Sequence, residues 1–95
     1  MIDLRKVDAN RVAVEALLNG GRNLDGTRMR TLYGGEVVHA LERLGYDDIG
    51  EGDAYEHDSY RMVTDEYWDQ FCAEVRKHYH KHLSTPSRQL KRMLA

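Results

Sequence analysis

Apolar residues recur every three or four positions along three stretches of the chain, which is the spacing of one face of an α-helix. The first stretch predicts a helix over residues 8–19. Asp8, or alternatively Asn10, is suited to accept hydrogen bonds from the amides of the first turn. Gly20 and Gly21 end the helix, because glycine readily takes the left-handed conformation found after helices, and residues 22–26 form the connecting loop. The predicted buried face consists of Val12, Ala13, Ala16 and Leu17.

The second stretch predicts a helix from Thr27, as N-cap, to Leu44, with Gly45 following its end. Gly34 and Gly35 interrupt this helix at a cost of about 1 kcal/mol each relative to alanine. The pair either kinks one helix, divides it into a short helix and a turn, or admits a neighbouring backbone. The continuous register favours a single kinked helix. Its predicted apolar face consists of Met29, Leu32, Tyr33, Val37, Ala40, Leu41 and Leu44.

The third stretch predicts the longest helix. Thr64 is its N-cap, and Asp65 and Glu66 lie in the first turn, where the helix dipole favours negative charge. Pro86 ends the segment. The apolar stripe of this helix consists of Trp68, Phe71, Cys72, Val75, Tyr79 and Leu83.

Residues 52–63 follow a different pattern, in which two short β-prone runs at 54–57 and 60–63 flank a polar centre. This predicts a hairpin, which must pack on the helices or recruit a third strand from residues 2–4, since an isolated hairpin is marginally stable. The predicted fold is therefore mostly α, with three helices and a small antiparallel β-hairpin in one compact domain, residues 1–86. A basic tail, residues 87–95, is either docked or frayed, and its apolar positions are Leu90, Met93 and Leu94.

Composition limits what this domain can be. The chain has 95 residues, of which 41% are hydrophobic and 32% charged, so it can build one modest core but no deep enclosed site. A single cysteine, Cys72, excludes an internal disulfide and a multi-cysteine zinc site. The early charges at Asp3, Arg5 and Lys6 argue against a signal peptide, and no apolar run approaches the roughly 20 residues that span a bilayer. We expect a soluble, cytoplasmic protein.

Charge is sorted along the sequence. Residues 47–69 contain nine carboxylates and one base, Arg61, whereas residues 75–95 contain six bases, three histidines and no acid. The formal net charge of −2 therefore conceals a dipolar distribution. Such a field attracts partners of opposite sign but does not define a reaction.

The acidic segment also contains tyrosines, and carboxylates interleaved with aromatic rings can imitate the phosphates and bases of a nucleic acid. The competing interpretation is that the rings belong to the core and that the acids form a solvated loop, or are neutralised by the basic tail. The predicted partner-binding residues are Asp47, Asp48, Glu51, Asp53, Tyr55, Glu56, Asp58 and Tyr60.

The basic segment is the alternative site, because clustered Lys and Arg side chains bind phosphates. Its residues are Arg76, Lys77, Lys81, Arg88, Lys91 and Arg92. The glycine pair within the second helix also suggests a helix-turn-helix. That motif would present Glu36 and Glu42 to the phosphate-lined groove, which is unfavourable.

Metal binding and catalysis have weaker support. His78 and His82 are four residues apart and could share a zinc ion, but Glu74 is about 12 Å from His82 along a helix and cannot join them. Mild cations near a helix end are the simpler interpretation, and we expect no metal or cofactor. Cys72 lies on the buried stripe, where a thiol is inert. No catalytic motif is present, so we expect no enzyme.

The sequence thus predicts a small non-catalytic protein that docks through its acidic, tyrosine-rich face on a protein with a basic surface. Occlusion of a nucleic-acid-binding surface would make it an inhibitor of the kind that phages and mobile elements produce, such as an anti-CRISPR. The alternative is a helix-turn-helix-like regulator that binds nucleic acid through the basic C-terminal segment. Self-association into a homodimer is possible if the apolar stripes are wider than one domain can bury.

Overall fold

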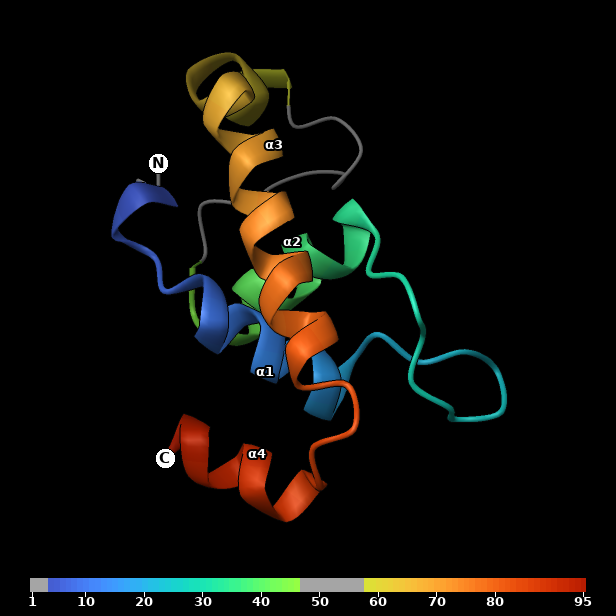
Figure 1. Cartoon of the computed structure of the whole chain (residues 1–95). Coiled ribbons are helices and arrows are strands. Elements are labelled where there is room, and N and C mark those ends of the chain that lie inside the picture. Colours follow the sequence, from blue (N-terminus) through green and yellow to red (C-terminus); the bar gives the residue numbers. More distant parts are fainter. Residues whose placement is uncertain (1–3, 47–57) are drawn as a thin grey trace.

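The α1 helix (Ala9–Asn19) packs against each of the other α-helices (Figure 1), most extensively against α3 and then against α2 and α4. The computed structural model describes the backbone of residues 4–46 and 58–95, and the side chains of residues 4–46 and 67–95. A 3-10 helix, η1 (Leu4–Lys6), precedes α1, and α2 (Gly34–Arg43), α3 (Asp58–Lys81) and α4 (Ser87–Leu94) follow it. The described residues are mostly helical, as predicted, and contain no β-strand.

Both predicted ends of α1 are confirmed. The amide of Asn10 donates to Asp8 Oδ1 at 2.9 Å, so Asp8 rather than Asn10 is the cap. At the other end, the amide of Gly20 donates to the carbonyl of Ala16, and Gly21 has a φ of +62°. Residues 12–17 are all buried, because neighbouring helices cover α1 on several sides.

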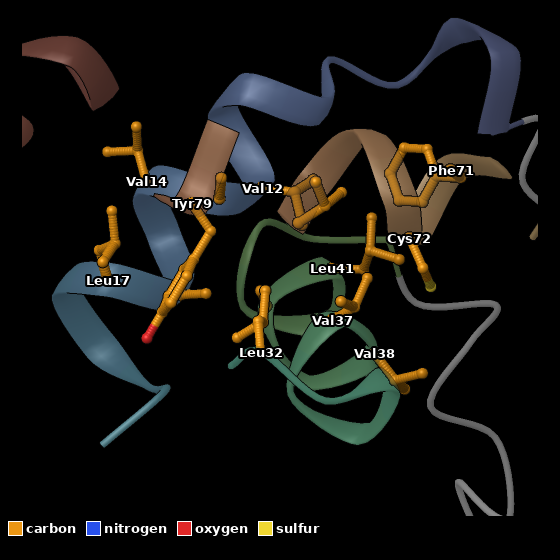
Figure 2. Close-up of a cluster of buried hydrophobic side chains, with 14 of the residues drawn as sticks. Val12, Val14, Leu17, Leu32, Val37, Val38, Leu41, Phe71, Cys72 and Tyr79 are labelled. Carbon is orange, nitrogen blue, oxygen red and sulfur yellow. The ribbon is translucent and has the colours of Figure 1, made fainter. Parts of the chain in front are cut away.

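The core surrounds α1 and is mainly aliphatic (Figure 2). The predicted stripe of α3 supplies Phe71, Cys72, Val75 and Tyr79, all of which are buried. Each large side chain removed from water contributes about 1.5–3 kcal/mol to folding. The other buried apolar residues are Leu4, Val12, Ala13, Val14, Ala16, Leu17, Leu32, Val37, Val38, Ala40, Leu41 and Leu90.

The predicted helix over residues 27–44 is wrong in its first half. Residues 27–33 are not helical, and α2 begins at Gly34, so the glycine pair starts the helix instead of kinking it. The reason is tertiary. The amide of Met29 donates to the carbonyl of Gly21 at 2.7 Å, and the carbonyl of Met29 accepts a hydrogen bond from the Tyr79 hydroxyl at 2.8 Å. These contacts replace helical hydrogen bonds, and Tyr33, predicted to lie on a buried face, is exposed.

The predicted start of the third helix at Thr64 is also wrong. The α3 helix begins at Asp58 and includes residues 60–63, so the second strand of the predicted hairpin is helical. Residues 54–57, the other predicted strand, lie outside the described residues, as do Ile2 and Asp3, and Leu4 belongs to η1. Tyr, Met and Val disfavour a helix by only a few tenths of a kcal/mol each. Extending an existing helix adds one hydrogen bond per residue, which overrides so small a preference.

The C-terminal segment is helical and packs on α1. Leu90 of α4 is fully buried and Leu94 is partly buried against the core. Met93, the third predicted apolar position, is 41% exposed. Two anchoring leucines therefore hold a helix that is too short to be stable alone.

Candidate functional site

Most of the predicted acidic docking residues lie outside the part of the chain that the structure describes. Asp47, Asp48, Glu51, Asp53, Tyr55 and Glu56 lie outside the described residues. Asp58 and Tyr60 are placed by their backbone alone, in the first turn of α3. The acidic face therefore stays a prediction.

The basic residues of the alternative site are well placed on α4. Arg88, Lys91 and Arg92 are exposed, and Lys91 and Arg92 lie three and four residues after Arg88, which places all three on one side of the helix. Leu90 and Leu94 point the other side of α4 into the core. The docking of α4 thus turns three cations outward together.

The remaining predicted cations lie on the last turns of α3. Lys77 and Lys81 are exposed and four residues apart. Arg76 is half-buried, and its Nε donates to the carbonyl of Leu32 at 2.8 Å. Arg76 therefore holds the segment before α2 against α3.

A second arginine, Arg28, joins the α1–α2 connection to the α3–α4 connection. Its Nη1 donates to the carbonyls of Leu83 and Thr85, at 2.8 Å each, and its Nη2 donates to Ser87 Oγ at 3.1 Å. These contacts link residues more than fifty positions apart in sequence. They bring residues 20–33, which contain three arginines, beside the basic C-terminal segment.

We call residues 20–33 and 76–95 together the basic end. Its one acidic side chain is Asp25, and the carboxylate of Glu36 also contacts it at the amide of Gly21. Its nine cations are Arg22, Arg28, Arg30, Arg76, Lys77, Lys81, Arg88, Lys91 and Arg92. Such an excess of one sign creates a positive potential that attracts polyanions.

Tyr79 anchors the basic end to the core. Its hydroxyl lies 3.0 Å from the carbonyl oxygen of Gly21 and 2.8 Å from that of Met29, so both carbonyls share one donor. Burial raises the pKa of the Tyr79 hydroxyl, with Arg28 and Arg22 opposing part of the shift. The hydroxyl therefore keeps its proton at neutral pH and can donate it.

The first turn of α3 and the α4 helix lie at opposite ends of α3 (Figure 1). The 24 residues of this helix extend over about 36 Å, and α4 lies beyond its C-terminal end (Figure 1). The first turn of α3, with Asp58, is therefore several Debye lengths from α4, since the Debye length is about 8 Å at physiological salt.

The polar residues of α2 have internal roles. Glu36 Oε2 accepts a hydrogen bond from the amide of Gly21 at 3.1 Å, and Arg43 Nε lies 3.2 Å from the carboxylate of Glu15, a buried residue of α1. A helix-turn-helix centred on the glycine pair needs a helix directly before Gly34. Residues 27–33 are not helical, so that helix is absent.

The thiol of Cys72 is buried, and the imidazole of His82 is held by a hydrogen bond. Cys72 is 3% exposed, and burial raises the pKa of its thiol to about 11. His82 Nε2 lies 2.9 Å from Asn10 Oδ1, joining the end of α3 to α1. Within residues 4–46 and 67–95, no three His, Cys, Asp or Glu side chains come together as metal ligands would.

No protein-family model, curated protein or solved structure matches the chain. Among the helices that the structure describes, none has the length and apolar character needed to cross a membrane. The candidate site therefore rests on its own geometry.

Sequence reasoning missed Arg22, Arg28 and Arg30 as members of the basic end. Three arginines within nine residues were a signal. However, assigning residues 27–44 to a helix concealed that they belong to one connection beside the C-terminal segment.

Proposed function

We propose that the protein is a non-catalytic nucleic-acid-binding protein that holds phosphate groups on its basic end. The observation that carries the proposal is the set of hydrogen bonds from Arg28, which unites two basic segments of the sequence. The six cations of the C-terminal segment alone are ordinary for an exposed helix end. Nine cations, against Asp25 and the adjoining carboxylate of Glu36, match the electrostatic footprint of a nucleic-acid-binding surface.

Binding of this kind is driven by the release of counterions from the phosphate backbone. The exposed side chains of α4 and of the last turns of α3 make the phosphate contacts. Arg28 and Arg76 already donate hydrogen bonds to backbone carbonyls, so they contribute charge and hold the surface together. The interaction is accordingly sensitive to salt and tolerant of sequence.

Fluorescence anisotropy with labelled DNA and RNA oligonucleotides of random sequence tests the proposal. Affinity should fall steeply between 50 and 200 mM salt, and replacing Arg88, Lys91 and Arg92 by glutamine should reduce the slope of log K against log salt by about 2–3, which is about 0.7–0.9 for each lost cation. Lys6→Gln, which removes an exposed cation on η1, is the matched control and should leave the slope unchanged. Absence of binding at 50 mM salt, or equal effects of the two variants, would overturn the proposal.

The second candidate is the predicted docking of a basic protein partner on the acidic segment. It is favoured by the backbone position of Asp58, which lies at the end of α3 opposite to α4. The test is a charge-reversal variant with lysine at positions 47, 48, 51 and 53. A partner must bind the wild type but not this variant, and it must still bind the protein in which Arg88, Lys91 and Arg92 are replaced. In the complex the partner must also lose its own binding to nucleic acid.

A further inference from the structure

Tyr33 is an exposed aromatic residue of the basic end. Tyr33 is 63% exposed. The other aromatic residues whose side chains the structure describes are buried or partly buried against the core, namely Tyr46, Tyr67, Trp68, Phe71 and Tyr79. Among the large apolar side chains that the described residues expose, namely Leu24, Tyr33 and Met93, Tyr33 is the one aromatic ring. An exposed tyrosine therefore requires a separate explanation.

The backbone on both sides of Tyr33 is fixed. The carbonyl of the preceding residue, Leu32, accepts the hydrogen bond from Arg76 Nε, and the Leu32 side chain is fully buried. The carbonyl of Tyr33 itself accepts hydrogen bonds from the amides of Glu36 and Val37, at 3.0 and 3.2 Å. The ring is thus presented from a rigid position, which lowers the entropic cost of binding.

The surroundings of Tyr33 suit a flat, negatively charged ligand. Arg76 is held at the adjacent peptide group, and Arg30 lies three residues earlier in the connection. The two residues that follow Tyr33 are Gly34 and Gly35, and a Cβ at either would meet no atom within 4 Å beyond its chain neighbours and the backbone of its own helix. The two glycines therefore place no side chain on the first turn of α2, directly after Tyr33.

We infer that Tyr33 is a stacking platform for an unpaired base, and that the nucleic acid bound by the basic end is single-stranded. This inference rests on the proposed function and specifies its ligand. Single-strand-binding proteins combine cations that follow the backbone with aromatic rings on which bases stack. In a duplex the base faces are covered by neighbouring pairs, so Tyr33 would contribute nothing there.

Anisotropy titrations with a single-stranded oligonucleotide and with its duplex, as DNA and as RNA, test the inference on the full chain. The single strands should bind at least about tenfold more tightly than the duplexes, and Tyr33→Ala should weaken single-strand binding by about tenfold, within the range that loss of one stacked base produces. Tyr33→Phe should retain the affinity, because it keeps the ring. Leu24→Ala, which truncates an exposed apolar residue of the same connection, should have no effect.

Circular dichroism must be unchanged in all three variants, as expected for exposed side chains. Binding of single strands and duplexes with equal affinity, together with no effect of Tyr33→Ala, would overturn the inference and leave the proposed function standing. A Tyr33→Phe variant as weak as Tyr33→Ala would also overturn it, since the hydroxyl rather than the ring would then be required. Failure of every oligonucleotide to bind would overturn both.

Discussion

Arg28 and Arg88 carry the same charge at the same end of the molecule, yet the fold uses them differently. The guanidinium of Arg28 donates three hydrogen bonds to groups around the α3–α4 connection. Arg88 is exposed, and within the described part of the chain it has no hydrogen-bond or ion-pair partner. The comparison separates cations that build the basic end from cations that the basic end offers to a ligand.

Removing Arg28 should have the largest effect on stability. Arg28→Ala leaves two backbone carbonyls and a hydroxyl without their donor, and we expect a loss of about 3 kcal/mol in the free energy of unfolding. Arg88→Ala should change it by no more than about 0.5 kcal/mol, as for other exposed positions. Urea unfolding of both variants at pH 7 measures the difference, and equal losses would remove the distinction between the two arginines.

The Gly21 position is the next most sensitive. Gly21 and Gly26 both have positive φ, but a Cβ at Gly21 would lie 2.9 Å from the Tyr79 hydroxyl oxygen, whereas one at Gly26 would meet nothing within 4 Å. Gly26→Ala should therefore lose about 1 kcal/mol from backbone strain alone, and Gly21→Ala roughly 2 kcal/mol or more, because the anchor must also shift. Thermal unfolding of the pair provides the measurement, with the opposite order as the contradicting result.

The Tyr79 hydroxyl has a smaller predicted effect. Tyr79→Phe keeps the buried ring but deprives the carbonyls of Gly21 and Met29 of their shared donor, at a cost of about 1–2 kcal/mol. Tyr33→Phe removes the same group from an exposed ring and should leave the free energy of unfolding unchanged. If denaturant midpoints fall equally in the two variants, the hydroxyl of Tyr79 is not the anchor.

The smallest effect concerns pH. Burial, followed by Lys81 and His78, lowers the pKa of His82 below its usual 6.5. The unfolded chain therefore binds this proton more readily, so the contribution of His82 to stability is complete above pH 6.5 and declines as pH falls through the lowered pKa. His82→Gln should reduce the loss of stability between pH 7.5 and 5.5, measured by urea unfolding. A variant with the same pH dependence as the wild type would contradict this assignment.

Much of the helical content was predictable from local patterns. The cap at Asp8, the glycines after α1 and the stripe from Phe71 to Tyr79 express hydrogen-bonding and burial preferences that operate within one or two turns. Burial of Cys72 followed from the same stripe. The predicted hairpin failed for the corresponding reason, since the short β-prone run at residues 60–63 was weaker than the extension of α3.

The candidate site was predictable only in part. Arg88, Lys91 and Arg92 were identified by charge, but that they face outward together depends on the docking of α4 through Leu90 and Leu94. Arg28 joins these cations through its hydrogen bond to Thr85, and Tyr33 is exposed where Arg76 holds the carbonyl of Leu32. Both contacts link residues that are more than forty positions apart in sequence. No local preference encodes such contacts.

By itself, the sequence determined which segments are amphipathic and how the charges are ordered along the chain, because both follow from residue type and spacing. The tertiary structure decided where α2 and α3 begin and which cations share a surface. Hydrogen bonds between distant segments compete with helical ones at those positions, and only the packed molecule determines which set forms.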